Sequence, residues 1–545
     1  MRLAPALAPA AAIVLIAAPA LAQDLVIAGG PIYTGVPGRP SAGMVVVQDG
    51  RIAYVGDDGA KVKLKPGTRR IDLAGAALYP GFTDGHAHLR GIGERELSLN
   101  LEGAKSAAEA AARVKAYLAA RRPAGPVWGR GWIETGWPEG RFLERSDIDP
   151  VAPDQPVLLV RADGHALVAN SAALRAAGID ETTAAPPGGA IQKDAAGRLT
   201  GMLVDNAMEL VATLQRAPTE ADRRAAFDAA FRVEAAYGWT GVHSMSVAWA
   251  DVGLLEALDA EGKAPLRVYN AVDVEQAGPL FAGGPRATRG GRITTRAIKL
   301  YEDGALGSRG AALFEPYADA PATTGLVRTP EAQMRAAMEK AKAAGIQVAT
   351  HAIGDRGNAD VLDLYAGLGA KDLRWRIEHA QIVRPADIAR FADLGAIASM
   401  QPSHAIGDLH FAPARLGDAR LAGAYAWEGM RKAGVTVVGG SDAPVERGDP
   451  LIEFYAAVAR KDLAGFSAPN WRPEQKLSRA EALALFTSAA AYARFAEKEL
   501  GTIEVGKRAD LSAFSVDLMT APEAEIPKGH ATLTVVDGRV VYRRP

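Results

Sequence analysis

The chain has 545 residues, in which 62 lysines and arginines nearly balance 63 aspartates and glutamates, so the net charge is -1 and offers no surplus of cations for binding nucleic acid. Hydrophobic residues at 48% and charged residues at 23% are ordinary for a globular protein and disfavour both disorder and many membrane spans. Cysteine is absent, which excludes disulfides and cysteine-ligated metals and leaves the 9 histidines as candidates for metal chemistry.

Residues 1–22 have the pattern of a secretory signal peptide. An early arginine precedes an apolar, alanine-rich stretch, and Ala20-Leu21-Ala22 forms a small-x-small cleavage site before Gln23. Three prolines leave the apolar run too short for a good membrane-spanning helix. We therefore expect cleavage after Ala22 and a periplasmic or secreted mature protein that does not associate with a membrane.

Short strands are predicted at both ends of the mature chain. Apolar, β-branched runs at residues 25–27, 44–47 and 52–56 are separated by turn residues, and the same pattern returns at residues 509–514 and 532–541. We expect the two β-rich ends, residues 23–78 and 500–545, to pair into one small β-sandwich domain.

Residues 79–499 alternate short apolar strands with alanine-rich helices, which is typical of βα units around a parallel sheet. Eight strands are predicted, at residues 78–86, 240–245, 266–273, 296–301, 346–351, 374–379, 396–400 and 435–441. Eight such repeats predict an α/β fold, a (β/α)8 TIM barrel whose chemistry lies at the C-terminal ends of the strands.

A long segment, residues 91–235, separates the first two predicted barrel strands. It is too long for a βα connection and is predicted to hold an inserted α/β subdomain. The segment contains a helix over residues 106–121, a strand over residues 157–160 and a hairpin around residues 195–197. Because it follows the end of a barrel strand, we expect it to lie over the catalytic face as a lid.

Side chains suited to metal binding end several predicted strands. His86 and His88 close the first strand, and side chains two apart in a strand face the same way, so both imidazoles could hold one ion. Further candidates end other strands: Lys299, His351, His379 and Asp442. Core residues have no reason to gather at strand ends, so the pattern favours a metal centre. His243 also ends a strand and is interpreted as a core residue or as a support behind the ligands.

Together these motifs resemble the amidohydrolase superfamily of metal-dependent barrel hydrolases. Within it they are most similar to the long branch named after YtcJ, which includes N-substituted formamide deformylases. The resemblance covers nearly the whole mature chain and rests on residues 80–88, 129–132, 163–165, 170–171, 303–309, 377–380 and 440–444. Ser244 departs from the branch, which favours aspartate there.

The resemblance implies two divalent metal ions. His86 and His88 would ligate the first ion, and His351 and His379 the second. Lys299, carbamylated by carbon dioxide, would bridge them, and Asp442 would bind the first ion and the catalytic water. Imidazole and carboxylate ligands suit zinc, the expected metal, but also admit manganese, iron or cobalt.

The implied reaction is hydrolysis of a C–N bond in a small amide-like molecule, such as an N-substituted formamide. A metal-activated hydroxide would attack the carbonyl, and Asp442 would carry its proton to the leaving nitrogen. In the alternative interpretations, Lys299 is an ordinary buried lysine paired with a carboxylate such as Asp303, and Asp442 caps a turn.

Contacts to the substrate are predicted from loops and strand ends at the same mouth of the barrel. The candidates are His165, Arg309, His404, Trp132 and Tyr301. His165 could donate to the substrate oxygen or fix its own loop, and Arg309 could clamp a carboxylate or brace its loop.

Other functions stay open at this point. An exported dipeptidase or N-acyl amino acid hydrolase would use a cation such as Arg309 to hold the substrate carboxylate, and a deaminase is a third possibility. A non-catalytic barrel relative would be a binding protein, but it predicts loss of ligands, and all six candidates are present. A homodimer is a reasonable expectation for such a barrel.

Overall fold

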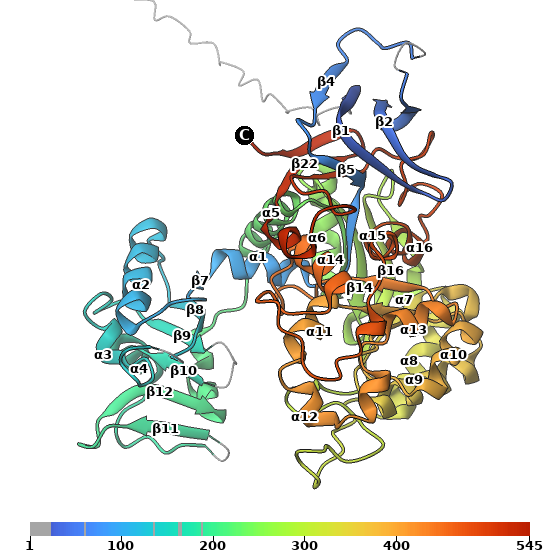
Figure 1. Cartoon of the computed structure of the whole chain (residues 1–545). Helices are drawn as coiled ribbons and strands as arrows, with labels where there is room; N and C mark the ends of the chain where they lie inside the picture. The colour runs from blue at the N-terminus through green and yellow to red at the C-terminus, as the bar shows by residue number, and fades with distance from the viewer. Residues whose placement is uncertain (1–22, 59–61, 135–136, 162–165, 187–188) are drawn as a thin grey trace, which may run out of the picture.

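Three β-sheets organise the protein (Figure 1). The structure is a computed structural model that describes residues 23–58, 62–134, 137–161, 166–186 and 189–545. The predicted signal peptide, residues 1–22, and the predicted substrate contact His165 lie outside these ranges. None of the helices within them has the length and apolar character needed to cross a membrane.

The central sheet is the predicted parallel barrel. Its strands neighbour one another in the order β20-β19-β18-β17-β16-β14-β13-β6. Their bounds are β6 (Phe82–Ala87), β13 (Trp239–Val247), β14 (Arg267–Asp273), β16 (Ile293–Tyr301), β17 (Gln347–Ala352), β18 (Arg376–His379), β19 (Ile397–Met400) and β20 (Val437–Gly439). A short strand, β15 (Arg286–Ala287), pairs antiparallel with β16. The prediction of an α/β barrel with eight parallel strands is confirmed.

The first and last barrel strands approach each other closely at Gly85. A Cβ atom at this position would lie 2.4 Å from the carbonyl oxygen of Gly439, so only glycine lets β6 and β20 come together without displacement. This contact nearly closes the barrel and brings the end of β6 beside the turn that follows β20.

Helices surround the barrel. They are α5 (Glu220–Tyr237), α6 (Trp249–Ala260), α7 (Gly278–Gly283), α8 (Glu331–Ala343), α9 (Asp355–Leu368), α10 (Pro385–Leu394), α11 (Pro402–Asp408), α12 (Ala412–Leu416), α13 (Trp427–Lys432), α14 (Pro450–Ala459), α15 (Arg479–Phe486) and α16 (Ser488–Ala493). Local signals set their ends. In α5, the Thr219 hydroxyl accepts from the Asp222 amide at the start, and Gly238 ends the helix with φ 103°.

The predicted first strand, residues 78–86, is in fact two strands in different sheets. β5 (Ala77–Pro80) belongs to the sheet of the chain ends, and β6 begins the barrel at Phe82. Between them, a Cβ atom at Gly81 would lie 2.4 Å from Thr240 Oγ1. The chain therefore changes sheet at a tightly packed glycine, which the continuous apolar pattern conceals.

The two chain ends form one eight-stranded sheet. Its order is β23-β22-β21-β5-β1-β2-β3, with β4 beside β1. The bounds are β1 (Leu25–Val36), β2 (Arg39–Gln48), β3 (Arg51–Gly56), β4 (Arg69–Asp72), β21 (Leu511–Phe514), β22 (Ala531–Val536) and β23 (Arg539–Arg543). N-terminal and C-terminal strands meet where β5 pairs with β21, and both ends contribute to one small apolar core.

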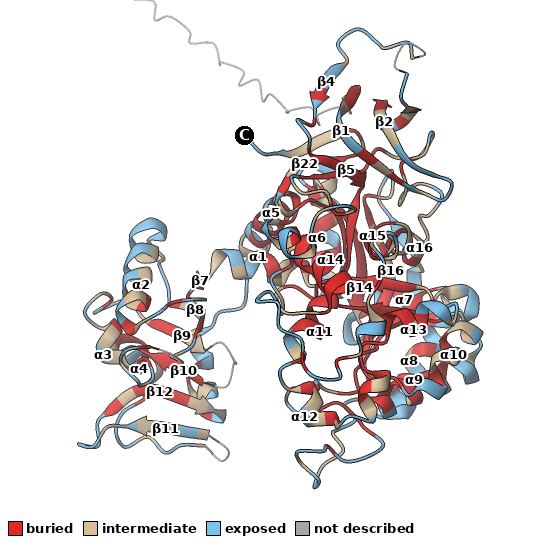
Figure 2. Ribbon diagram, in the orientation of Figure 1, coloured by how far each residue is buried: buried red, intermediate tan, exposed pale blue. Residues whose placement is uncertain are grey.

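The third sheet lies within the predicted insertion. Its order is β11-β12-β10-β9-β8-β7, formed by β7 (Leu99–Asn100), β8 (Val127–Trp132), β9 (Val157–Arg161), β10 (Ala166–Ala169), β11 (Gly189–Lys193) and β12 (Leu199–Asp205). Helices α2 (Ala107–Arg121), α3 (Arg145–Ile148) and α4 (Ser171–Ala177), with the 3-10 helix η2 (Asn206–Leu214), accompany it. Figure 2 shows buried residues along β9 and β10 as well as along the barrel strands, whereas β11 at the edge of the sheet has none.

The insertion stands beside the barrel as a separate body. Figure 1 shows its sheet to the left of the barrel, connected through α1 (Leu89–Leu97). The Tyr117 hydroxyl donates to the carbonyl oxygen of Leu97, 2.9 Å away. The segment predicted as an insertion, residues 91–235, also includes most of α1 and α5, but these two helices pack on each other and on the barrel core.

Candidate metal centre

The predicted ligands meet at the C-terminal ends of the barrel strands. Strand register brings them together: Tyr301 of β16 lies beside His351 of β17, and Ala352 lies beside His379 of β18. Asp442 follows β20, and its amide donates to the carbonyl oxygen of His86 on β6 at 2.7 Å. Residues distant in sequence therefore form one site because the barrel places their strand ends next to one another.

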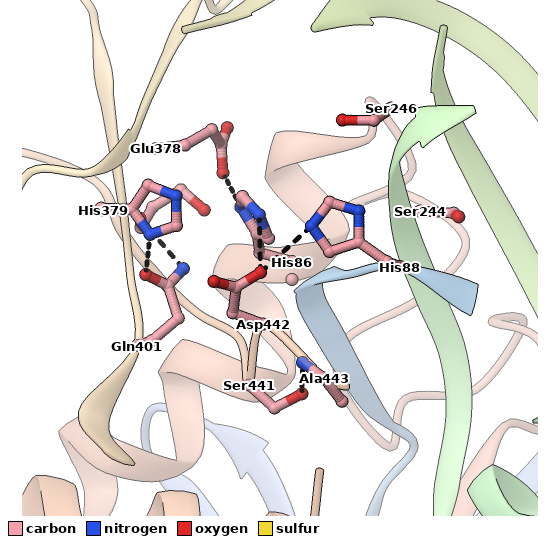
Figure 3. A network of polar contacts seen from close by, with 12 residues as sticks. His86, His88, Ser244, Ser246, Glu378, His379, Gln401, Ser441, Asp442 and Ala443 are labelled. Atoms are coloured by element: carbon pink, nitrogen blue, oxygen red, sulfur yellow. Dashed lines mark hydrogen bonds and ion pairs between the residues drawn. The ribbon is translucent and has the colours of Figure 1, made fainter. Parts of the chain in front are cut away.

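Asp442 is the meeting point of this site (Figure 3). Its Oδ1 lies 3.4 Å from His86 Nε2 and 3.2 Å from His88 Nε2. Its Oδ2 lies 3.6 Å from His404 Nε2. Two groups of potential ligands share this carboxylate, His86 with His88 and His379 with His404, and in each group the ligand atoms lie within 4.8 Å of one another.

The imidazoles of the site pack ring against ring. The ring centres of His86 and His379 are 4.8 Å apart, and those of His351 and His379 are 4.5 Å apart. The His404 ring stacks on His379 at 5.8 Å. His351 therefore borders the site through His379, although it is not a member of either group around Asp442.

Partners behind the histidines fix which ring nitrogen faces the site. Glu378 Oε2 lies 2.6 Å from His86 Nδ1, and Gln401 Oε1 lies 2.8 Å from His379 Nδ1. Because both partners are acceptors, each Nδ1 donates a proton and each Nε2 turns a lone pair toward the site. Such an arrangement is typical of metal-binding histidines, whose second ring nitrogen is held by a carboxylate or carbonyl.

His404 has the opposite arrangement. The Gln381 Nε2 amide lies 2.9 Å from His404 Nδ1 and donates to it. The proton of a neutral His404 therefore sits on Nε2, which points toward Asp442 as a donor. By distance His404 could join a metal-binding group, but its hydrogen bonding favours donation to an oxygen atom.

A buried charged group supports His86, and the sequence reasoning missed two of its members. Arg376 holds Glu378 through Nε and Nη2 at 2.6 and 2.9 Å, and its Nη1 lies 2.9 Å from His243 Nδ1. Burial opposes ionisation of Glu378, but Arg376 outweighs it and holds the pKa of this carboxyl well below its usual range. His243 therefore acts as a support, and the period-two spacing of Arg376 and Glu378 on β18 was the available signal.

Lys299 lies at the end of β16 with 1% of its surface exposed. Its Nζ lies 5.3 Å from the centre of the Tyr301 ring and makes no hydrogen bond or ion pair with a described residue. The suggested partner Asp303 does not pair with it, because this carboxylate accepts from the amides of Ala312, Ile353 and Gly354 and lies 3.4 Å from His351 Nε2. Burial lowers the pKa of Lys299 to about 8, so its amine loses a proton more readily than an exposed lysine does.

The turn that carries Asp442 is fixed by Asp84. This buried carboxylate accepts from the Ser441 amide at 2.9 Å and from the His86 amide at 3.1 Å, and it also accepts from the Ser441 hydroxyl. Asp442 and His379 have φ values of 59° and 74°, in the left-handed region that such residues rarely adopt. Unusual backbone conformations of this kind persist where the surrounding structure holds them, and they concentrate at functional sites.

The donor atoms of this site fit a metal ion. Two buried atoms within the His86 group have no hydrogen-bond partner: His86 Nε2 and Asp442 Oδ1. The Nε2 atom of His351 lies 3.4 Å from Asp303 Oδ1 instead. Burial lowers the pKa of His351 to about 3 and the pKa of His379 well below its usual range, so both imidazoles are neutral. Burial works to raise the pKa of Asp442, but His86 and His88 outweigh it and keep the carboxylate ionised. Neutral imidazoles and ionised carboxylates are the forms that bind zinc.

A cavity of 160 Å³ adjoins the site at His88. Ser244, Ser246 and the ion pair between Arg90 and Asp251 are among its lining residues. Figure 3 shows Ser244 and Ser246 on the same side of the site as His88. The cavity offers polar groups beside the candidate ligands, where part of a small molecule can lie.

The structure places two predicted substrate contacts elsewhere. The Trp132 side chain is fully buried in the core of the insertion, where its Nε1 donates to Leu159 at 2.8 Å, which corrects the expectation that it contacts substrate. Arg309 forms a bidentate ion pair with Asp319, in which Nε and Nη2 donate to the two carboxylate oxygens at 3.1 and 2.9 Å. Arg309 therefore braces its own loop instead of facing the site. Of the other candidates, Tyr301 and His404 do border the site.

Most of the chain matches the amidohydrolase family and proteins named after it. The sequence model of the amidohydrolase family matches residues 69–542. The chain is 35% identical to the Bacillus subtilis (strain 168) protein YtcJ, which carries the name amidohydrolase, over 95% of this chain and 99% of the relative. It is 28% identical to the N-substituted formamide deformylase of Arthrobacter pascens, over 96% and 99% of the two chains.

A solved structure agrees with these sequence matches. An uncharacterized metal-dependent hydrolase from Pyrococcus horikoshii OT3 superposes with a TM-score of 0.76 at 28% identity. The match covers 92% of this chain and 99% of that chain, so it includes the barrel, the sheet of the chain ends and the insertion.

Proposed function

Because the chain belongs to the amidohydrolase family, and so is a metal-dependent hydrolase acting on carbon–nitrogen bonds, we propose that it hydrolyses an N-substituted formamide or a related small amide. The observation that carries the proposal is the position of Asp442, whose ionised carboxylate lies between two histidine groups at the barrel mouth. The formamide class comes from the relative that bears this activity in its name.

His86, His88 and Asp442 would hold one metal ion, His351 and His379 would hold a second, and carbamylated Lys299 would supply a further carboxylate. Zinc is the expected metal, since neutral imidazoles and carboxylates suit it. When bound, such ions polarise a substrate carbonyl and lower the pKa of the attacking water.

Proton movement falls to the chain's own residues. Asp442 accepts a proton from the attacking water and delivers it to the leaving nitrogen, so one carboxylate serves both transfers. His404 points its Nε2 proton into the same space and would donate a hydrogen bond to the substrate oxygen as negative charge develops there.

Carbamylation of Lys299 fits its surroundings. The reaction joins Nζ to the carbon of carbon dioxide with loss of a proton, and it requires the neutral amine. Burial favours this form, and no described acidic side chain pairs with the ammonium. The carbamate would add an anionic ligand to a buried site whose other candidate ligands are mostly neutral imidazoles.

Arg328 keeps a second candidate function open. Its guanidinium lies 4.7 Å from the centre of the Tyr301 ring at the edge of the site, and it makes no ion pair with a described residue. A free arginine there could hold a substrate carboxylate bidentately, as an N-acyl amino acid or a dipeptide would require. The predicted clamp, Arg309, is committed to Asp319.

Export is part of the proposal. The signal-like segment, residues 1–22, supports a mature protein that begins at Gln23 and acts in the periplasm or outside the cell. A small soluble amide would be its substrate there.

The proposed function is tested by a substrate panel measured with the wild-type chain and with Arg328→Met. N-substituted formamides should give the highest kcat/KM, and the substitution should change it less than about threefold, because a neutral substrate does not need the cation. If N-acyl amino acids or dipeptides are preferred and lose more than about tenfold in kcat/KM with Arg328→Met, the second candidate replaces the first.

Elemental analysis and intact native mass spectrometry on the same preparation test the proposed metal content, the carbamylation of Lys299 and the cleavage of the signal peptide. Two metals per chain and the added mass of one carbon dioxide are expected, together with a mass that begins at Gln23 in protein recovered from an export-competent host. No metal and no turnover on any amide would contradict the hydrolase assignment at this site, and an unprocessed exported chain would contradict cleavage.

A further inference from the structure

A second pocket lies at the opposite end of the barrel from the metal centre. It has a volume of 430 Å³ and is bordered by the first residues of two barrel strands, with Arg267 opening β14 and Thr294 near the start of β16. Five arginines and one acid are among its lining residues: Arg51, Arg267, Arg296, Arg494, Arg508 and Glu499. We call this cavity the arginine pocket.

Three of the arginines have acidic partners. Arg267 is held by Asp510 at 2.6 Å, and Arg508 by Asp537 at 2.9 Å. Glu499 is shared between Arg508 and Arg51. The pair of Arg267 with Asp510 joins the barrel to the sheet of the chain ends, so it has a structural role.

The remaining two, Arg296 and Arg494, have no acidic partner among the described residues. Arg494 is 5% exposed, its Nη2 donates to the Gly291 carbonyl oxygen at 3.2 Å, and its Nη1 has no hydrogen-bond partner. Arg296 stacks its guanidinium 3.9 Å from the centre of the Phe495 ring, and its buried Nε also has no partner. A buried guanidinium with an open donor is costly unless an acceptor reaches it.

The electrostatic environment of Arg494 also favours binding of an anion. Burial, followed by repulsion from Arg267, lowers the pKa of Arg494 to about 10. An arginine whose charge is penalised in this way gains when an anion enters the pocket beside it. Glu499, already shared by two arginines, does not supply that negative charge.

We propose that the arginine pocket binds a phosphate group, with the guanidinium groups of Arg494 and Arg296, which line it without acidic partners, as its main contacts. Planar guanidinium groups match the oxygen geometry of phosphate, and two of them can hold one group from two sides. Gly290 and Gly291 border the pocket with φ values of 82° and 66°, a conformation that favours glycine, and because glycine has no side chain they leave room beside the guanidinium groups.

The volume of the arginine pocket allows two sources of the same chemistry. Inorganic phosphate would occupy only the arginine-lined part. An organic phosphate monoester could also place its carbon portion against Phe495, Ala496 and Leu500, which line the remainder. Neither would be the amide substrate, because the metal centre lies at the other end of the strands.

The test is isothermal titration calorimetry of the metal-loaded full chain, with ionic strength held constant by sodium chloride. Inorganic phosphate and phenyl phosphate are titrated into wild type, Arg296→Gln and Arg494→Gln. Arg232→Gln is the control, because it removes one positive charge at an exposed helix position, paired with Asp228, outside the pocket. We expect one site per chain and affinity at least about tenfold weaker in both pocket variants, with the control unchanged.

Tighter binding of phenyl phosphate supports an organic monoester, and equal affinity supports inorganic phosphate; both support the site. If Arg494→Gln unfolds, as judged by circular dichroism, Arg296→Gln decides alone, because its side chain is only partly buried. No saturable binding would overturn the proposal. Equal binding by wild type and Arg296→Gln would also overturn it, because that result would place the phosphate outside the arginine pocket.

Discussion

Asp442 lies where two requirements of the site meet. It must approach His86 and His88 closely enough to share a cation, and it must also remain able to exchange a proton with a substrate. The Asp84 carboxylate holds the turn before it, and the left-handed backbone of Asp442 directs its side chain to the barrel mouth. The turn therefore keeps an unfavourable backbone conformation at Asp442, and this conformation places the carboxylate at the barrel mouth.

Asp442→Asn should separate the proton-transfer role from metal binding and folding. The amide keeps the shape and one coordinating oxygen but cannot accept the proton, so kcat should fall by about 10²–10⁴-fold. Metal content should stay above about one half of the wild-type value, and the midpoint of thermal unfolding should change little. Steady-state kinetics and elemental analysis measure both, with the exposed Asp228→Asn as a matched control. Wild-type turnover in Asp442→Asn would remove this residue from the mechanism.

The sequence allowed the candidate ligands to be found because each one ends a strand, and a barrel brings strand ends together. It could not show which way a side chain faces within a loop or an insertion. Trp132 follows the same kind of strand end, yet it packs inside the insertion. Arg376 and Glu378 were missed because a buried ion pair has no sequence pattern beyond its spacing. Its role in supporting His86 depends on contacts that only the folded structure shows.

At the scale of elements, α5 joins the barrel to its surroundings. One side of it packs on α1, where a Cβ atom at Gly93 would lie 1.7 Å from the carbonyl oxygen of Ala226. Another side buries Glu234 completely, and neither carboxyl oxygen of this residue has a hydrogen-bond partner. Burial, reinforced by nearby Asp84, raises the pKa of Glu234 well above its usual range.

Glu234→Gln should therefore change how stability depends on pH. The folded protein holds a proton on Glu234 that the unfolded chain releases above pH 4.5, so wild-type stability falls as pH rises through this window. The variant does not titrate and escapes this loss, which is about 1.4 kcal/mol for each pH unit. We expect it to be more stable than wild type at pH 8 but to differ little near pH 5.

Denaturant unfolding of the metal-loaded protein at the two pH values measures the effect. Glu220→Gln is the control, because this glutamate lies on the same helix with 62% of its side chain exposed. Parallel pH profiles for wild type and Glu234→Gln would mean that the buried carboxyl is not protonated in the folded protein.

Element boundaries show where periodicity is sufficient and where it fails. Most barrel strands were predicted to within a few residues, because short apolar runs between helices have few other interpretations. Residues 78–86 were read as one strand because the apolar run is continuous, and only the packing of Gly81 against Thr240 reveals the change of sheet. Such close packing between distant segments depends on the folded structure, and the hydrophobic pattern of the sequence does not show it.

At the scale of the whole molecule, the chain consists of a barrel with two additions that are attached differently. The sheet of the chain ends is tied to the barrel by buried ion pairs, such as that of Arg267 with Asp510 and Asp537. The insertion has its own apolar cores and meets the barrel through α1. This difference implies that the insertion is a separable unit, whereas the terminal sheet is part of the barrel's stability.

A deletion variant tests this division. Residues 99–214 are replaced by a short glycine–serine linker that joins α1 to α5, whose mutual packing is independent of the insertion. The variant should fold and bind the same number of metal ions, because every candidate ligand lies outside the deleted segment. Its kcat/KM should fall by about tenfold or more if the insertion helps to enclose the substrate, as its position after the first strand predicts.

Metal analysis, thermal unfolding and kinetics provide the readouts, with the isolated segment 99–214 expressed alongside. If the deletion variant loses its metals while remaining soluble, the barrel depends on the insertion for its site, and the division into separable units is wrong.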